Sequence, residues 1–358
     1  MGFCAAAVQS YDGASPACCR GRLRARHNVN TEATVIDARA EQARLWALAA
    51  LGLSEAGFAQ ASADASFRRY FRVSSPEGSW IVMDAPPQQE DCGPFLRVAA
   101  LLRAAGVHVP AVLAEDLQQG FLLLSDLGRQ TYLDALDARN ADALFSDAID
   151  ALILWQKSSR PDVLPPYDDA LLRRELKLFP DWFIVRHLGR TLSDAQAHAL
   201  ATVDDLLVRS ALAQPRVFVH RDYMPRNLMR SSPNPGVLDF QDAVYGPVTY
   251  DLVCLFKDAF LSWPAERVDG WIAQYRERAI AAGVPVGDDP EVFRHALDLM
   301  GVQRHLKVLG IFARILHRDG KPKYIADAPR FVGYIRAVAA RYPELSPLQE
   351  LFDELELP

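Results

Sequence analysis

A short stretch of this sequence carries two carboxylates and an amide at a spacing that suits catalysis. An apolar run at residues 217–219, long enough for a buried strand, turns polar at Asp222, and Asn227 follows five residues later. A second apolar run at residues 236–238 delivers Asp239. We therefore predict that these three polar side chains converge where two short strands end.

The chemistry that best uses this set is transfer of a phosphoryl group from a nucleotide. Such a reaction needs a carboxylate that orients the attacking hydroxyl and accepts its proton, and hard oxygen ligands that hold Mg²⁺ against the phosphates. Asp222 fits the first role as the catalytic residue, and Asn227 and Asp239 fit the second as metal ligands. The expected cofactors are ATP and Mg²⁺.

The residues HRDYMPRN, followed by LDF at 238–240, resemble the catalytic loop and metal-binding segment of protein kinases. Similar segments occur in the aminoglycoside and choline phosphotransferases. More closely, HRDYMPRNLM with VLDFQDAVYGPVTYDL is similar to the bacterial cell-wall sugar kinases, which phosphorylate N-acetylmuramate and N-acetylglucosamine at the anomeric hydroxyl. The resemblance implies this activity here, with a small-molecule amino sugar as substrate. It also implies that Asp251 holds the catalytic loop through backbone amides.

The same resemblance implies an α+β, two-lobed protein-kinase-like fold, with a small antiparallel sheet lobe and a larger, mainly helical lobe. We expect residues 37–128 to form the N-terminal nucleotide-binding lobe and residues 129–358 the C-terminal catalytic and acceptor-binding lobe. Residues 1–36 show no sustained periodicity, which favours a disordered extension or the product of an upstream start codon. From Ala38 an apolar face at helical spacing predicts the first helix.

The elements that must position the catalytic residues follow from apolar periodicity. Two strands around a turn at 62–66 are expected within residues 58–73, and a third at 80–84. Residues 343–358 read as a polar, acidic tail. Helices are expected at 95–105, 132–158, 253–260, through most of 263–342, and within 162–189, where Pro180 breaks the pattern.

The phosphate clamp departs from the protein-kinase pattern. Met83 occupies the place where a protein kinase carries the lysine that binds the α and β phosphates, and the N-terminal third of the chain has no lysine. Arg68, Arg69 and Arg72 alternate along the second strand, so at least one guanidinium should face the cleft. We expect Arg68 and Arg69 to bind the nucleotide. Glu90 and Asp91 precede the helix expected at 95–105 and act either as its N-terminal acids or as pairing partners for the arginine.

Resemblance to the aminoglycoside phosphotransferases also places the hinge at FLLLSDLG, residues 121–128. The Ser125 carbonyl and the Leu127 amide would then meet the adenine ring.

Protein kinases have no counterpart of residues 162–189, whereas small-molecule kinases insert helices at this point to build an acceptor pocket. Glu175 could bind sugar hydroxyls there, and Trp182 could cover C–H groups, although core packing explains the aromatic residue equally well. Arg304 shares a helix face with Lys307. These cations could meet the lactyl carboxylate of N-acetylmuramate, or they could simply be solvated.

Composition bounds the remaining possibilities. The net charge of −6 argues against a nucleic-acid-binding surface, and no apolar run approaches the length of a membrane span. The five cysteines show no paired metal spacing, so a reduced cytoplasmic protein is the simplest interpretation.

Two other functions stay open at this point. A choline- or aminoglycoside-type kinase takes a cationic acceptor and would need an acid-rich pocket, which Asp168, Asp169 and Glu175 could provide. A nucleotide-binding pseudokinase is suggested by Met83 and by the absence of glycines from the turn at 62–66.

Overall fold

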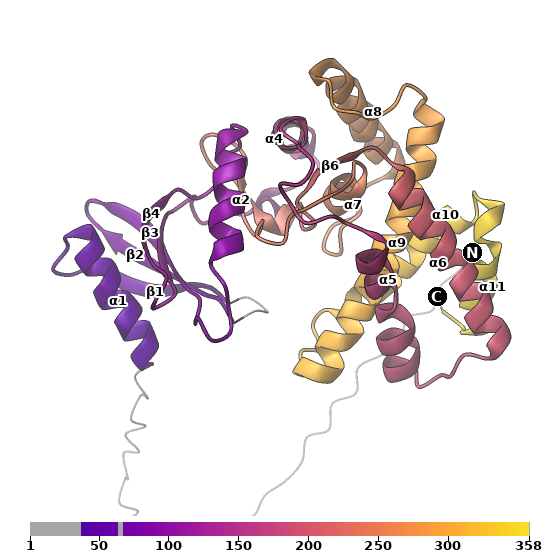
Figure 1. The fold of residues 1–358 in the computed structure, drawn as a ribbon, viewed down its shortest axis with the longest axis horizontal. Helices are drawn as coiled ribbons and strands as arrows, with labels where there is room; N and C mark the ends of the chain where they lie inside the picture. Colours follow the sequence, from indigo (N-terminus) through magenta and orange to yellow (C-terminus); the bar gives the residue numbers. More distant parts are fainter. Residues whose placement is uncertain (1–36, 64–66, 358) are drawn as a thin grey trace, which may run out of the picture.

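The computed structural model describes residues 37–63 and 67–357. They form a sheet lobe and a larger helical lobe, which lie at opposite ends of the longest axis (Figure 1). This arrangement confirms the predicted two-lobed α+β fold. The expectations for residues 1–36 and for residues 64–66 of the predicted turn lie outside the described residues.

The smaller lobe is built on one five-stranded sheet in which neighbouring strands are antiparallel. The register between the second and third strands sets Arg69 opposite Asp84 and Tyr70 opposite Met83. Because side chains alternate across a strand, Arg69 and Asp84 lie on one face and Met83 on the other. In spatial order the strands are β1 (Gly57–Ala63), β2 (Arg69–Ser75), β3 (Gly78–Asp84), β5 (Phe121–Ser125) and β4 (Val112–Asp116).

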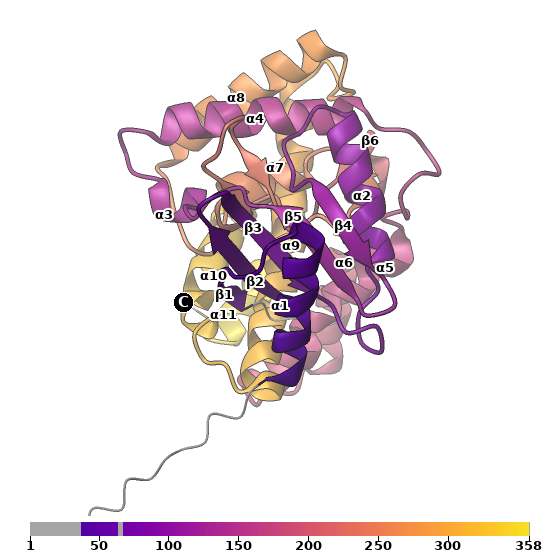
Figure 2. The same cartoon turned by 90° about the vertical axis from the view of Figure 1, so that its left-hand side faces the viewer.

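Different helices cover the two faces of this sheet (Figure 2). α1 (Ala38–Leu51) begins where predicted, with the Asp37 carboxylate capping its first turn, and packs against Val82 and its neighbours. α2 (Gly93–Ala104) lies on the other face, where Met83 joins the main core that continues into the helical lobe.

Nine α-helices build most of the larger lobe within the described residues. None of the described helices is long and apolar enough to cross a membrane. The predicted helix at 132–158 is interrupted, because the Asp137 carboxylate accepts the backbone N–H groups of Arg139 and Asn140 and makes a turn. The helices are α3 (Tyr132–Ala135), α4 (Ala141–Lys157), α5 (Asp169–Leu176), α6 (Asp194–Ala213), α7 (Tyr250–Phe256), α8 (Ala265–Ala282), α9 (Pro290–Asp319), α10 (Ala328–Ala339) and α11 (Ser346–Glu354).

Pro180 marks a change of helix type. α5 ends before it, and the chain continues as a π-helix, η1 (Phe179–His187), with Pro180 in the first turn, where no backbone donor is needed. This π-helix packs closely against α9, because a Cβ atom at Gly310 would collide with the backbone of Leu178. Pro180 therefore does not break the helical course of the chain as predicted, because the α-helix stops at Leu176 and Pro180 lies within the π-helix that follows.

The prediction of a polar tail at 343–358 is wrong. Residues 346–354 form α11, and Leu348, Leu351 and Phe352 are buried in the main core. These residues recur at helical spacing, so the acidic residues between them occupy only the exposed face.

Four short strands carry the catalytic segment. β6 (Arg216–Val219) pairs with β9 (Val244–Pro247), and β7 (Leu228–Met229) pairs with β8 (Gly236–Val237). The two predicted apolar strands before Asp222 and Asp239 are therefore present. Helix α7 begins at Tyr250, so it starts three residues earlier than predicted and includes Asp251.

Candidate active site

The structure brings together the three residues that the spacing singled out. The Asn227 side-chain amide donates to the Asp222 backbone carbonyl at 2.9 Å and to Asp239 Oδ2 at 3.3 Å. Gln241 Nε2 donates to the other Asp239 oxygen at 2.9 Å. Asp239 has a left-handed backbone, with φ of 62°, where the chain turns directly after β8. Asp222, Asn227 and Asp239 thus form one cluster.

This cluster suits a hard cation such as Mg²⁺. The Asn227 nitrogen is engaged in hydrogen bonds, which leaves its amide oxygen as the ligand, beside the carboxylate of Asp239. No group of three or more His, Cys, Asp or Glu residues in the described ranges could hold a metal by itself. A site with two protein ligands fits Mg²⁺, which keeps water and substrate phosphates in its shell.

Buried hydrogen bonds hold the catalytic loop in place. The Asp251 carboxylate accepts the backbone N–H of His220 at 2.7 Å and that of Arg221 at 3.0 Å, which confirms its expected supporting role. Burial lowers the pKa of His220 to about 4, so its imidazole is neutral at pH 7. Its Nδ1 can then accept from the Asp222 N–H at 3.2 Å while Nε2–H donates to the Leu238 carbonyl at 3.0 Å.

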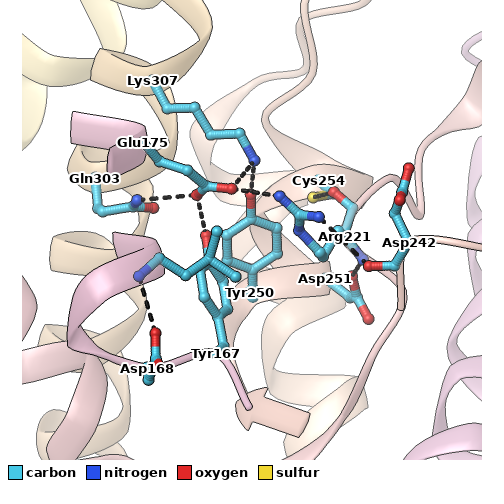
Figure 3. A network of polar contacts seen from close by, with 11 residues as sticks. Tyr167, Asp168, Glu175, Arg221, Asp242, Tyr250, Asp251, Cys254, Gln303 and Lys307 are labelled. Atoms are coloured by element: carbon cyan, nitrogen blue, oxygen red, sulfur yellow. Dashed lines mark hydrogen bonds and ion pairs between the residues drawn. The ribbon is translucent and has the colours of Figure 1, made fainter. Parts of the chain in front are cut away.

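Glu175 is the centre of a buried polar network (Figure 3). Its carboxylate pairs with Arg221 and, at 2.9 Å, with Lys307, and it accepts hydrogen bonds from the Tyr167 hydroxyl and the Gln303 amide. Burial raises the pKa of Glu175, but Lys307 and Arg221 outweigh that effect and lower the pKa to about 2. The expectation that Glu175 binds sugar hydroxyls is therefore corrected, since both of its oxygens already serve α9 and the catalytic loop.

The arginines of the sheet lobe divide between its two faces. Arg68 pairs at 2.9 Å with Glu90, one of the two acids considered as partners, and both side chains are largely buried. Arg69 instead contacts Asp84 at 2.6 Å on the face covered by α1. This placement argues against the expectation that Arg69 binds nucleotide, because its guanidinium is engaged with Asp84 on the face opposite Met83.

The hinge is braced by an ion pair that the sequence did not reveal. Arg72 donates to both oxygens of Asp126 at 2.6 and 3.1 Å, so the second strand is tied to the residue after Ser125. Ser125 Oγ accepts the N–H of Ala111 at 2.8 Å. The Leu127 side chain lies against Gly236, at the start of the strand that precedes Asp239.

The other side chains expected to contact the acceptor are partly or fully buried. Trp182 is half-buried in η1 and packs against the main core. Arg304 is only 3% exposed and Lys307 only 9% exposed, so the interpretation of these two cations as solvated charges is wrong. Lys307 is committed to Glu175 and to the Tyr250 hydroxyl, at 2.9 Å each. Asp258, which lies just after α7, is also buried and was not anticipated.

The site combines Asp222, Asn227 and Asp239 at the ends of short strands, and the sheet lobe carries the buried Arg68–Glu90 pair. Together with the two-lobed fold, this arrangement is typical of a phosphotransferase with a kinase-like fold. Comparison with known proteins agrees with this class. The chain belongs to the phosphotransferase enzyme family, whose pattern matches residues 57–292.

Two curated relatives sharpen the comparison. The chain is 62% identical over 296 residues, or 83% of its length, to the N-acetylmuramate/N-acetylglucosamine kinase of Pseudomonas putida, and the match covers 87% of that protein. The enzyme of the same description from Neisseria meningitidis is 48% identical over 300 residues, which cover 82% of this chain and 89% of the relative.

Solved structures share the fold at much lower identity. A choline/ethanolamine kinase family protein from Mesorhizobium loti superimposes with a TM-score of 0.59 at 17% identity, covering 88% of this chain and 97% of that one. An ADP-bound aminoglycoside phosphotransferase gives a TM-score of 0.55 at 14% identity, covering 82% and 98%. These matches show that the two-lobed phosphotransferase fold spans nearly the whole chain.

Proposed function

We propose that this protein transfers the terminal phosphoryl group of ATP to the anomeric hydroxyl of N-acetylmuramate and N-acetylglucosamine. The single observation that carries the proposal is the Asp222–Asn227–Asp239 cluster in a chain 62% identical to a kinase described for these two sugars. We also propose that the reaction takes place in the cytoplasm, where ATP is available, as a step of cell-wall sugar recycling.

Each residue of the cluster has a defined task in this reaction. Asp222 orients the acceptor hydroxyl and takes its proton, and Asn227 holds the catalytic loop through the Asp222 carbonyl. Asn227 and Asp239 would bind Mg²⁺, which supplies charge neutralisation for the phosphates when it is bound. An anomeric hydroxyl is more acidic than an ordinary alcohol, so a carboxylate base of modest strength is sufficient.

On the nucleotide side, we propose that Arg68, held by Glu90, replaces the missing lysine as the phosphate clamp. Both guanidinium and ammonium groups bind phosphate, and a buried carboxylate partner fixes either one in place. We expect the Ser125 carbonyl and the Leu127 amide to bind adenine. The Arg68–Glu90 pair supports an active kinase over a pseudokinase.

The charges around the acceptor side argue against a cationic substrate. Asp168 caps α5 through the Leu171 N–H at 2.9 Å, and Asp169 pairs with Arg173 at 2.9 Å. Glu175 is neutralised by two buried cations. The acids that could have attracted choline or an aminoglycoside are therefore engaged within the protein, which supports a neutral or anionic acceptor.

The product of the reaction tests this proposal. Incubation with ATP, Mg²⁺ and either sugar should consume reducing ends in step with ADP formation, because a glycosyl 1-phosphate is no longer a reducing sugar. Proton NMR should show coupling of phosphorus to the anomeric hydrogen. ADP formation with the reducing end retained would refute anomeric transfer, and the absence of acceptor-dependent ADP with both sugars would refute the substrate assignment.

A further inference from the structure

Two buried groups of opposite charge lie where the end of α7 meets α9. Arg304 is 3% exposed and Asp258 is 2% exposed. Within the described part of the chain, Arg304 Nη1 and Asp258 Oδ2 have no hydrogen-bond partner. The other oxygen of Asp258 accepts the N–H of Ala259 at 2.6 Å, so the carboxylate is held in one orientation. Burying a charged donor and a charged acceptor without partners is costly, so such a pair calls for a ligand.

The pair lies close to the catalytic base. His305, which follows Arg304, contacts Lys257, which precedes Asp258, because His305 Nε2 lies 3.3 Å from the Lys257 carbonyl. One turn earlier in α7, the Cys254 thiol donates to the Arg221 carbonyl at 3.1 Å, directly before Asp222 in the catalytic loop.

Electrostatics agrees with this placement. Burial lowers the pKa of Arg304, but nearby Cys254, Tyr250, Asp258 and Asp222 outweigh it and raise the pKa. The pKa of Asp258 is raised on balance, because burial outweighs the opposing effect of Arg304, the largest of the nearby positive charges that lower it. The two groups therefore interact with each other, and Arg304 also interacts with the catalytic base.

We propose that Arg304 and Asp258 form the subsite that recognises the acetamido group of the acceptor. This inference rests on the proposed function. An acetamido group offers one carbonyl acceptor and one N–H donor in opposite directions, whereas a guanidinium only donates and a carboxylate only accepts. In a 2-acetamido sugar this group is attached to the carbon next to the one that bears the reacting hydroxyl. A subsite beside Asp222 is therefore where the acetamido group should fall.

This assignment revises the expectation that Arg304 meets the lactyl carboxylate of N-acetylmuramate. A second carboxylate would be repelled by Asp258, and Lys307 is already engaged with Glu175 and Tyr250. The acetamido group, in contrast, is common to both proposed sugars. The pair would thus select 2-acetamido sugars as a class, because an analogue without this group leaves two buried charges unpaired.

Comparing N-acetylglucosamine with glucose, which lacks only the acetamido group, tests the inference. Arg304→Met and Asp258→Asn should each lower kcat/KM for N-acetylglucosamine roughly 10- to 100-fold, the effect of losing one hydrogen bond to a charged group, while glucose changes by less than about threefold. The control is Lys257→Met, which removes the neighbouring buried charge that pairs with Asp298 and should leave the preference for N-acetylglucosamine intact. An equal loss for both sugars, or no loss, would overturn the proposal.

Two further measurements keep the test decisive. If Arg304→Met does not fold, Arg304→Lys retains the buried charge with different donor geometry and should still reduce the preference for N-acetylglucosamine. An unchanged preference would count against the subsite.

Calorimetric binding of N-acetylglucosamine separates this inference from the proposed function. Should the parent protein phosphorylate neither sugar, the proposed function fails, but weaker binding to Arg304→Met than to the parent would still support the subsite. Equal binding, or no binding to either protein, would overturn it.

Discussion

Replacing Glu175 by glutamine tests whether this carboxylate supports the catalytic loop instead of contacting the acceptor. Glutamine keeps the shape of the side chain and removes its charge. Its carbonyl oxygen can still accept from Arg221 and Lys307, while the Tyr167 hydroxyl can rotate and the Gln303 amide can turn so that both accept from the new NH₂ group. The substitution therefore isolates the electrostatic contribution of the network.

The expected loss follows from the pKa of Glu175. Against the effect of burial, Lys307 and Arg221 lower this pKa from 4.5 to about 2. At about 1.36 kcal/mol per unit, the shift corresponds to about 3 kcal/mol of stability at pH 7. Because the pKa is lower in the folded protein, this stability is fully present above pH 4.5 and is lost as the pH falls towards 2.

Urea unfolding provides the assay. At pH 7 the free energy of unfolding of Glu175→Gln should be about 3 kcal/mol below that of the parent, and the difference should shrink below pH 4.5. In activity assays kcat should fall while the acceptor KM stays within about twofold, since the anchor of Arg221 loses its charge and no acceptor contact is removed.

A matched control lies on the same helix. Asp169→Asn breaks the half-exposed pair with Arg173 and should cost less than about 1 kcal/mol. A loss below about 1 kcal/mol for Glu175→Gln, or a loss that does not change with pH, would refute the electrostatic reasoning. A rise in acceptor KM at unchanged kcat would show that Glu175 contacts the acceptor after all.

Five further substitutions test the proposed roles. Asp222→Asn should lower kcat by roughly 10² to 10⁴-fold with nucleotide affinity and melting temperature unchanged, and substantial residual activity would place the base elsewhere. Asp239→Ala should remove the Mg²⁺ dependence of nucleotide binding in calorimetric titrations, so curves that overlay those of the parent would exclude it as a ligand. Arg68→Ala should weaken ATP binding, whereas Arg69→Ala should lower the melting temperature only, because its partner Asp84 lies under α1; the reverse pattern would exchange their roles. Met83→Lys should change ATP affinity little if Arg68 already clamps the phosphates.

The catalytic cluster was predictable because its geometry is local. Asn227 reaches the Asp222 carbonyl within one turn of chain, and the short β7–β8 pairing returns Asp239 to the same point. The strand ends and the polar residues that follow them are therefore visible in the order of residues alone. Asp251 is farther away, and its role came from resemblance.

Ion pairs between strands were not predictable in the same way. The choice between Arg68 and Arg69 depends on the register of β2 against β3, which sets Arg69 opposite Asp84. A shift of one residue would exchange the two arginines between the faces of the sheet. A signal was nevertheless present, because an aspartate at the end of an apolar strand needs a cationic partner once it is buried.

The surroundings of Glu175 and Arg304 could not be predicted, because they depend on contacts between elements far apart in the sequence. Glu175, Arg221 and Lys307 come from α5, the catalytic loop and α9, and only the packing of these three elements brings the charges together. Periodicity showed that Arg304 and Lys307 share one helix face, but it could not show whether that face is buried. For α11 the sequence did contain the necessary information. Its apolar residues recur at helical spacing, but the prediction gave more weight to the acidic residues between them.

The proposed role of Arg68 as the phosphate clamp would explain why the sheet lobe lacks the lysine of the protein-kinase pattern at Met83. Met83 lies on the sheet face that α2 covers, and its side chain belongs to the main core. We propose that the positive charge comes instead from Arg68, one residue before β2, where the Phe67 N–H, 3.3 Å from Glu90 Oε1, helps to orient the carboxylate that pairs with it. The reaction requires a cationic group at the position of the nucleotide phosphates, but it does not determine which strand supplies that group. A longer guanidinium that starts just before the neighbouring strand β2 can therefore replace a lysine on the central strand β3, provided that a buried acid fixes its direction.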